Sequence, residues 1–157
     1  MQAETATAPR RHVLPALAPV YRGLAPLIEP LVRATAGLLL VPHGAQKLFG
    51  AFGGGGLAGS AQFLDGIGYR PGMLWALALG SLEFFGGILL ALGLFTRPVA
   101  AAVTVFMAAA VLHHLPGGFF WPDGGFEYPL LWGVVALSFA VRGGGRYSLD
   151  ARLGREI

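Results

Sequence analysis

Four apolar stretches dominate this sequence of 157 residues, and they decide which solvent the chain folds in. They cover residues 27–49, 73–95, 98–115 and 128–141. A helix needs roughly 20 mostly apolar residues to cross about 30 Å of hydrocarbon, so the last two stretches need interfacial residues to complete a crossing. The chain is 55% hydrophobic and only 12% charged, which is outside the range of soluble domains. We therefore expect an all-α fold, an integral membrane four-helix bundle.

The basic side chains fall mainly on one side of the membrane that these stretches imply. That side has eight arginines, which are Arg10, Arg11, Arg22, Arg97, Arg142, Arg146, Arg152 and Arg155. The opposite side has Arg70 and Lys47, set against Asp65, Asp123 and Glu127. Because cytoplasmic flanks carry the excess of Lys and Arg, we predict that both termini are cytoplasmic. No nucleic-acid-binding motif accompanies the net charge of +3, so nucleic acid is not an expected partner.

Proline and glycine mark the segments between and before the apolar stretches. Prolines interrupt the start of the chain, so we expect a flexible tail over residues 1–20 and an interfacial turn or short helix over 21–30. The first outer connection, residues 50–71, opens with four glycines and continues with an apolar face at helical spacing. This pattern predicts a short interfacial helix. The second outer connection, residues 116–127, is rich in glycine and aromatic residues, and we expect it to form a lid against the headgroups.

Ionisable groups inside the apolar stretches indicate where chemistry could occur. An ionised group at mid-bilayer costs about 3 kcal/mol or more, so it must face the bundle interior. On the first stretch Arg33, His43 and Lys47 fall within an arc of about 80°. On the second stretch Glu83 lies near mid-span. Since the two helices run antiparallel, we predict that Glu83 lies within one or two turns in depth of both Arg33 and His43.

Small residues and further polar groups complete this expected site. Gly80 and Gly87 flank Glu83 and would let a neighbouring helix approach closely. His113 and His114 end the third stretch and Glu127 precedes the fourth, so all three could gather with Lys47 at the outer mouth.

Each of these residues also has a purely structural interpretation. Arg33 and Glu83 can form a buried ion pair that only fixes helix register. His43 can donate to a backbone carbonyl, and Lys47 can extend to the interface. His113 and His114 point about 100° apart, so they cannot line one site equally well. A metal site of His43, one of these histidines and Glu127 lacks the i, i+4 spacing of strong ligand pairs, and we assign no metal. The sequence has no cysteine, which excludes disulfide relays and thiolate-held clusters.

Four motifs along the chain resemble the DoxX family of small four-helix bacterial membrane proteins. They are RATAGLLLVPHGAQKLFG at 33–50, EFFGG at 83–87 with LLALGLFTR at 89–97, GFEYPL at 125–130 and GGGRYSLD at 143–150. The resemblance runs from about residue 24 to residue 151 and implies a multi-pass protein of the bacterial plasma membrane. Residues 21–151 are then the DoxX-like domain, between the tail at 1–20 and a cytoplasmic tail at 152–157.

The resemblance also implies a class of function. Relatives include the membrane subunit of a thiosulfate:quinone oxidoreductase and components of oxidoreductase complexes linked to thiol and oxidative stress. By this likeness, Arg33, His43, Lys47, Glu83 and Glu127 occupy the polar positions that characterise the family.

Two hypotheses follow. In the first, the chain is the membrane subunit of an oxidoreductase and binds a quinone headgroup, with Glu83 holding Arg33 and passing a proton. We assign catalysis to Glu83 and His43, and substrate binding to Arg33, Lys47, Glu127 and His113. Quinone is the candidate cofactor, and the candidate partners are the lipid bilayer, redox proteins and a second copy of the chain. In the second, the chain is a non-catalytic anchor or assembly subunit. A transporter is less favoured, because the four stretches show no evident inverted repeat.

Overall fold

A computed structural model describes residues 13–154 of the chain, and within this range the protein is helical and has no strand. The main helices are α1 (Ala18–Phe49), α2 (Gly56–Gly66), α3 (Gly72–Ser81), α4 (Gly87–Leu92), α5 (Thr96–His114), α6 (Glu127–Arg142) and α7 (Leu149–Leu153). A π-helical turn, η3 (Leu82–Gly86), joins α3 to α4 without a break. Short 3₁₀ turns lie at Pro15–Leu17, Ala51–Gly53, Leu115–Gly117 and Trp121–Asp123.

Three helical segments of the described range are long and apolar enough to cross a membrane. They are Pro15–Phe49, Gly72–Leu92 and Thr96–Gly117, and they confirm three of the four predicted stretches as membrane-compatible helices. The fourth stretch is also helical, as α6, but its 16 residues extend only about 24 Å. This is shorter than the hydrocarbon layer, which is about 30 Å thick.

The N-terminal part of α1 differs from the prediction. We predicted a flexible tail up to residue 20 and a separate interfacial segment over 21–30, but α1 is one helix from Ala18 to Phe49. Residues 1–12 of the predicted tail lie outside the described residues. Pro26, Pro30 and Pro42 all lie inside this helix. Each proline removes one backbone hydrogen bond, and membrane helices tolerate this loss because other groups compensate for it. We therefore gave the prolines too much weight as helix breakers.

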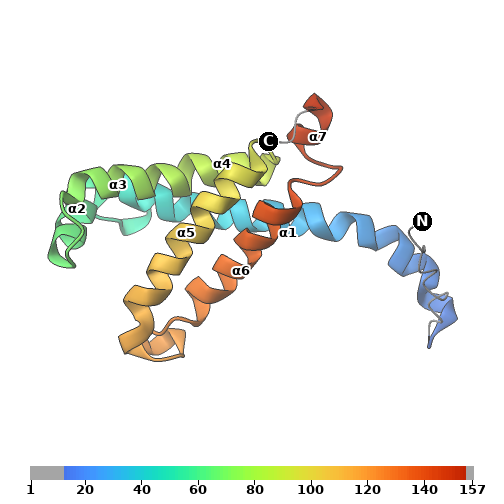
Figure 1. Cartoon of the computed structure of the whole chain (residues 1–157), viewed down its shortest axis with the longest axis horizontal. Coiled ribbons are helices and arrows are strands. Elements are labelled where there is room, and N and C mark those ends of the chain that lie inside the picture. Colours follow the sequence, from blue (N-terminus) through green and yellow to red (C-terminus); the bar gives the residue numbers. More distant parts are fainter. Residues whose placement is uncertain (1–12, 155–157) are drawn as a thin grey trace, which may run out of the picture.

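The helices form two antiparallel hairpins that cross at an angle (Figure 1). In the first, α3, η3 and α4 run alongside α1, and glycines bring the backbones together. A Cβ atom on Gly37 would overlap the backbone of Gly87 and Ala91, and one on Gly87 would lie 2.7 Å from the Gly37 oxygen. The close approach predicted for Gly87 is therefore confirmed. The second hairpin consists of α5 and α6, and the N-terminal half of α1 extends past it (Figure 1).

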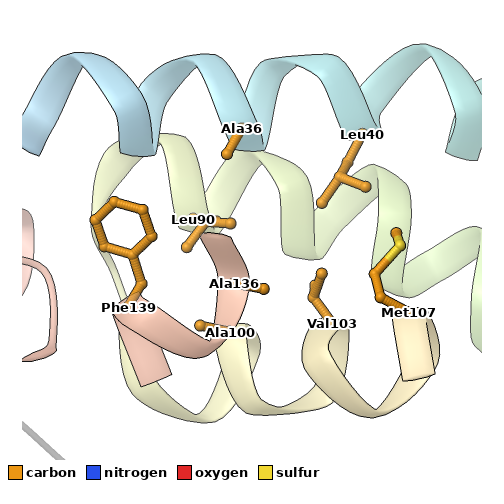
Figure 2. Packing of buried hydrophobic residues seen from close by; sticks show 8 residues of the cluster. All are labelled: Ala36, Leu40, Leu90, Ala100, Val103, Met107, Ala136 and Phe139. Carbon is orange, nitrogen blue, oxygen red and sulfur yellow. The ribbon is translucent and has the colours of Figure 1, made fainter. Parts of the chain in front are cut away.

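A hydrophobic core joins the two hairpins. Figure 2 shows its eight buried residues, which are Ala36, Leu40, Leu90, Ala100, Val103, Met107, Ala136 and Phe139. On α1 this cluster ends at Leu40, and on α5 it ends at Met107. Three of the eight are alanines, and small residues of this kind let helices pack closely in lipid. The core therefore holds the two hairpins together and stops before the last turns of α1.

The short helix predicted in the first outer connection is confirmed as α2. It packs on α3 through Ala61, Leu64 and Ala76, which form a second buried cluster. Figure 1 shows α2 lying across the end of α3 rather than along it. The Asp65 carboxylate accepts a hydrogen bond of 2.7 Å from the backbone N–H of Gly72, where α3 begins. This bond fastens α2 to the start of the next helix.

Candidate functional site

The best-defined polar contact inside the helices joins α1 to the π-helical turn. Lys47 Nζ lies 2.6 Å from Glu83 Oε2. Glu83 is only 4% exposed, whereas the Lys47 side chain is 29% exposed. A buried carboxylate is therefore paired with a lysine whose side chain is partly exposed.

The backbone around Glu83 has an unusual form. Residues Leu82–Gly86 form a π-helical turn, with α-helix on either side. Such turns are rare, contain one residue more than an α-helical turn, and are frequent at functional sites. The extra residue changes the direction in which side chains leave the helix. The π-helical turn is thus a second, independent sign that Glu83 occupies a special position.

Glycines on both helices allow the ion pair to form. A Cβ atom on Gly44 would collide with the backbone of Phe84, and one on Gly80 would lie 2.8 Å from a Leu48 methyl group. Gly44 and Gly80 each lie within three residues of a member of the pair. Without side chains at these positions, α1 and η3 come close enough for Lys47 to reach Glu83. The close approach predicted at Gly80 is confirmed.

His43 lies beside this pair and is exposed. On α1 it falls about 20° from Ala36 and about 40° from Lys47, so all three share one face. Ala36 is buried by the core, but the core ends before His43, which explains why the imidazole is exposed. His43 lies near enough to Glu83 to influence its electrostatic surroundings. Glu83, Lys47 and His43 thus form one cluster, which we call the Glu83 triad.

Arg33 does not meet Glu83, contrary to our prediction. The register of the first hairpin places Gly44 against Phe84 and Gly37 against Ala91, so Glu83 is level with the end of α1. Arg33 is instead level with Gly93, which its guanidinium group contacts. Its Nη2 donates a hydrogen bond of 3.0 Å to the Tyr147 carbonyl oxygen. The prediction erred because it fixed the helix direction and face but not the register.

The C-terminal segment completes the surroundings of Arg33. Asp150 Oδ1 accepts a hydrogen bond of 2.8 Å from Phe95 N, and Oδ2 accepts one of 2.9 Å from Thr96 N. The Asp150 N–H donates to the Gly93 oxygen at 2.9 Å. Asp150 therefore caps the N-terminus of α5, which its own N-cap residue, Phe95, cannot do. We did not predict this role, although Asp150 is part of the fourth motif.

This cap makes stability depend on pH. Burial alone raises the pKa of Asp150, but hydrogen bonds from Thr96 and Phe95, with the charge of Arg33, outweigh burial and hold the pKa below its usual range. The folded state therefore binds the Asp150 proton less readily than the unfolded state does. The stability that this carboxylate contributes is present above pH about 4 and is lost as pH falls through the lowered pKa.

We expect Asp150→Asn to lower the free energy of unfolding at pH 7 by about 1–3 kcal/mol, because an amide leaves one buried backbone donor without an acceptor. The variant should also lose the part of the pH dependence below pH about 4 that Asp150 causes. Thermal unfolding in detergent between neutral and acid pH measures both effects. Asp123→Asn, at an exposed position in the second outer connection, is the matched control and should behave as wild type.

The remaining predicted site residues organise the second outer connection. Glu127 Oε1 accepts a hydrogen bond of 3.1 Å from Trp121 N. His114 Nδ1 lies 2.8 Å from the Gly124 oxygen, and the His113 ring packs edge-on against Phe63 of α2 at 6.3 Å. Within the described part of the chain, neither a hydrogen bond nor an ion pair joins these three residues to the Glu83 triad. Residues 13–154 likewise contain no group of three or more metal-ligating side chains.

Comparisons with known proteins support the family that the motifs at 33–50 and 83–97 resemble. The DoxX family model matches residues 30–115, a segment that contains the whole Glu83 triad. An "Uncharacterized protein" of Haemophilus influenzae is 38% identical over 104 residues, which cover 60% of this chain and 78% of that protein. A protein of Bacillus subtilis named "Putative oxidoreductase CatD" is 28% identical over 120 residues, which cover 76% of this chain and 82% of that protein. No solved structure matches significantly. Because the family match covers more than half of the sequence, the chain belongs to the DoxX family of membrane proteins.

Proposed function

We propose that the chain is a membrane subunit of an oxidoreductase system, and that its Glu83 triad binds the polar head of a quinone. The observation that carries this proposal is the buried Glu83 carboxylate on a π-helical turn, paired with Lys47 and adjacent to an exposed imidazole. The name of the Bacillus subtilis relative is consistent with this class of function.

The residue types suit a quinone as substrate. Its two carbonyl oxygens accept hydrogen bonds, and its conversion to quinol takes up two electrons and two protons. Lys47 and His43 can donate hydrogen bonds to an oxygen, and Glu83 can exchange a proton through Lys47. The chain has no cysteine, so in this proposal a redox partner protein supplies the electrons. The partial exposure of Lys47 gives the headgroup a route to the pair.

Arg33, Glu127 and His113 have no part in this revised site. Arg33 lies 14 residues before Lys47, which is about 21 Å along the helix. One headgroup cannot contact both. Arg33 holds the C-terminal segment, and Glu127 shapes the outer connection. We therefore restrict the proposed site to Glu83, His43 and Lys47.

We further propose a four-helix bundle in the bacterial inner membrane, over residues 21–151, with both termini cytoplasmic. The short helix α6 would complete a fourth crossing with the help of aromatic residues at its outer end. There the ring centres of Trp121 and Tyr128 lie 5.4 Å apart. Interfacial rings of this kind favour the headgroup layer. The C-terminal end of α6 has Arg142, followed by Arg146, which fits the cytoplasmic side.

Binding of a quinone analogue to the purified, reconstituted protein tests the proposed site. We expect saturable binding that weakens about tenfold or more in Lys47→Met, because a hydrogen bond to a charged donor contributes about 1.5–3 kcal/mol. His43→Ala should weaken binding as well. Arg70→Ala, which removes an exposed cation of the first outer connection, is the control and should bind as wild type. Unchanged binding in both His43→Ala and Lys47→Met would reject the site.

A non-catalytic anchor or assembly subunit is the second candidate. One observation favours it, namely the long exposed apolar side of α1 at Leu24, Leu27, Ile28 and Leu31. A partner helix could cover such a surface. In this case the ion pair of Lys47 and Glu83 would serve helix association alone. Which of the two helices has the positive charge would not matter.

A further inference from the structure

A groove of about 280 Å³ lies between α1 and the C-terminal end of α6. Its walls include Ala25, Ile28, Glu29 and Val32 of α1 and Phe139 and Arg142 of α6. Glu29 lies 18 residues before Lys47, about 27 Å along α1. The groove is thus separate from the Glu83 triad, and it lies toward the end of the molecule where the arginines gather.

The rim of this groove has an excess of positive charge. The Arg142 side chain is 70% exposed, and its Nη2 lies 3.8 Å from Glu29 Oε1, which is too far for a hydrogen bond. The guanidinium group therefore keeps donors for another acceptor. Arg22 is exposed and lies seven residues before Glu29, so it shares the face of α1 that lines the groove. Two cations thus flank one carboxylate.

The wall of the groove is apolar and is open to the surroundings. Ile28 is 53% exposed and Val32 is 40% exposed. Residues 25–32 span about 10 Å of α1, a length that suits a segment of an acyl chain. A ligand that matches both parts of the groove is an amphiphile with an anionic phosphate group and an acyl chain. Arginine is suited to the phosphate, because its planar group can donate two parallel hydrogen bonds.

We propose that this groove binds an anionic phospholipid of the leaflet on the arginine-rich side. The phosphate interacts with Arg142 and Arg22, and one acyl chain lies along Ala25, Val32 and Phe139. Such a lipid bridges α1 and α6, two helices that otherwise make few contacts at this end. It therefore stabilises the crossing of the two hairpins.

Thermal unfolding of the full chain in neutral detergent, with added lipid, tests the proposal. Phosphatidylglycerol should raise the melting temperature more than phosphatidylcholine does, and inorganic phosphate alone should have no effect. Arg142→Gln should weaken the apparent affinity for phosphatidylglycerol about fivefold, the effect of losing one cation near an anionic lipid surface. Arg152→Gln, at an exposed position of α7, is the matched control and should leave the affinity unchanged.

A second pair of variants tests the apolar wall. Ala25→Leu fills the groove and leaves every charge in place, so it should reduce the rise in melting temperature that phosphatidylglycerol causes. Ala101→Leu, at an exposed position of α5, should not. Equal shifts from both lipids in the wild type, or an undiminished shift in Ala25→Leu, would overturn the proposal. A shift caused by inorganic phosphate alone would also overturn it, because it would indicate a simple anion site.

Discussion

Replacing Lys47 by methionine is expected to lower the free energy of unfolding by about 3 kcal/mol, because it leaves a buried carboxylate without its counterion. Glu83 is only 4% exposed, so water cannot take the place of the ammonium group. The fraction of folded protein during denaturant titration in detergent measures this loss. Arg70→Met is the control, since it removes an exposed cation outside the helices and should change stability by less than about 0.5 kcal/mol.

Reversing the pair distinguishes an ion pair that serves only helix association from one that serves chemistry. The double variant Lys47→Glu with Glu83→Lys keeps opposite charges in contact and should recover most of the stability lost in Lys47→Met. Under the proposed function it should still fail to bind the quinone analogue, because the donor and the carboxylate have exchanged helices. Full binding by the reversed pair would contradict the separate roles that the proposed function gives to Lys47 and Glu83. Failure of the reversed pair to recover stability would show that the π-helical turn accepts a carboxylate at position 83 but not an ammonium group.

The helices themselves could be predicted well from the sequence. Hydropathy over about 20 residues is a local property, and it placed the end of the first stretch at Phe49, where α1 ends. The cost of exposing charge to lipid likewise predicted that Glu83 and Arg33 would be buried, and both are. The prolines of α1 were misjudged because membrane helices tolerate proline better than the helices of soluble proteins do.

The pairing of the charged groups could not be predicted, because it depends on the register between helices. Arg33 and Lys47 are 14 residues apart on α1, or about 21 Å, so the register decides which of them reaches Glu83. The glycines set this register, since the facing backbone can come this close only where Gly37 and Gly44 have no side chain. The cap at Asp150 was missed for a related reason. Its bonds to Phe95 and Thr96 join residues more than 50 positions apart, and no local pattern indicates such a contact.

Gly44→Ala should also lower the free energy of unfolding strongly, because it separates the two helices that hold the ion pair. A Cβ atom there would lie 2.7 Å from Phe84 Cα, and backbone cannot move aside as a flexible side chain can. We expect a loss of about 1–3 kcal/mol in the free energy of unfolding, the usual cost of overpacking. Gly44 lies less than one turn from Lys47. Moving α1 away from η3 at Gly44 therefore also lengthens the contact between Lys47 and Glu83.

Gly23→Ala in the same helix is the matched control, and it should have the opposite sign. Nothing lies within 4 Å of a Cβ atom at Gly23, so alanine gains up to about 1 kcal/mol of helix propensity without a clash. The chain has no cysteine, so spin labels attached through cysteines at exposed Leu39 and Ile88 can report the separation of α1 and α4. That separation should increase in Gly44→Ala and stay constant in Gly23→Ala. An unchanged separation in Gly44→Ala, with wild-type stability, would mean that glycine contacts do not set the register and that the position of Lys47 opposite Glu83 has another cause.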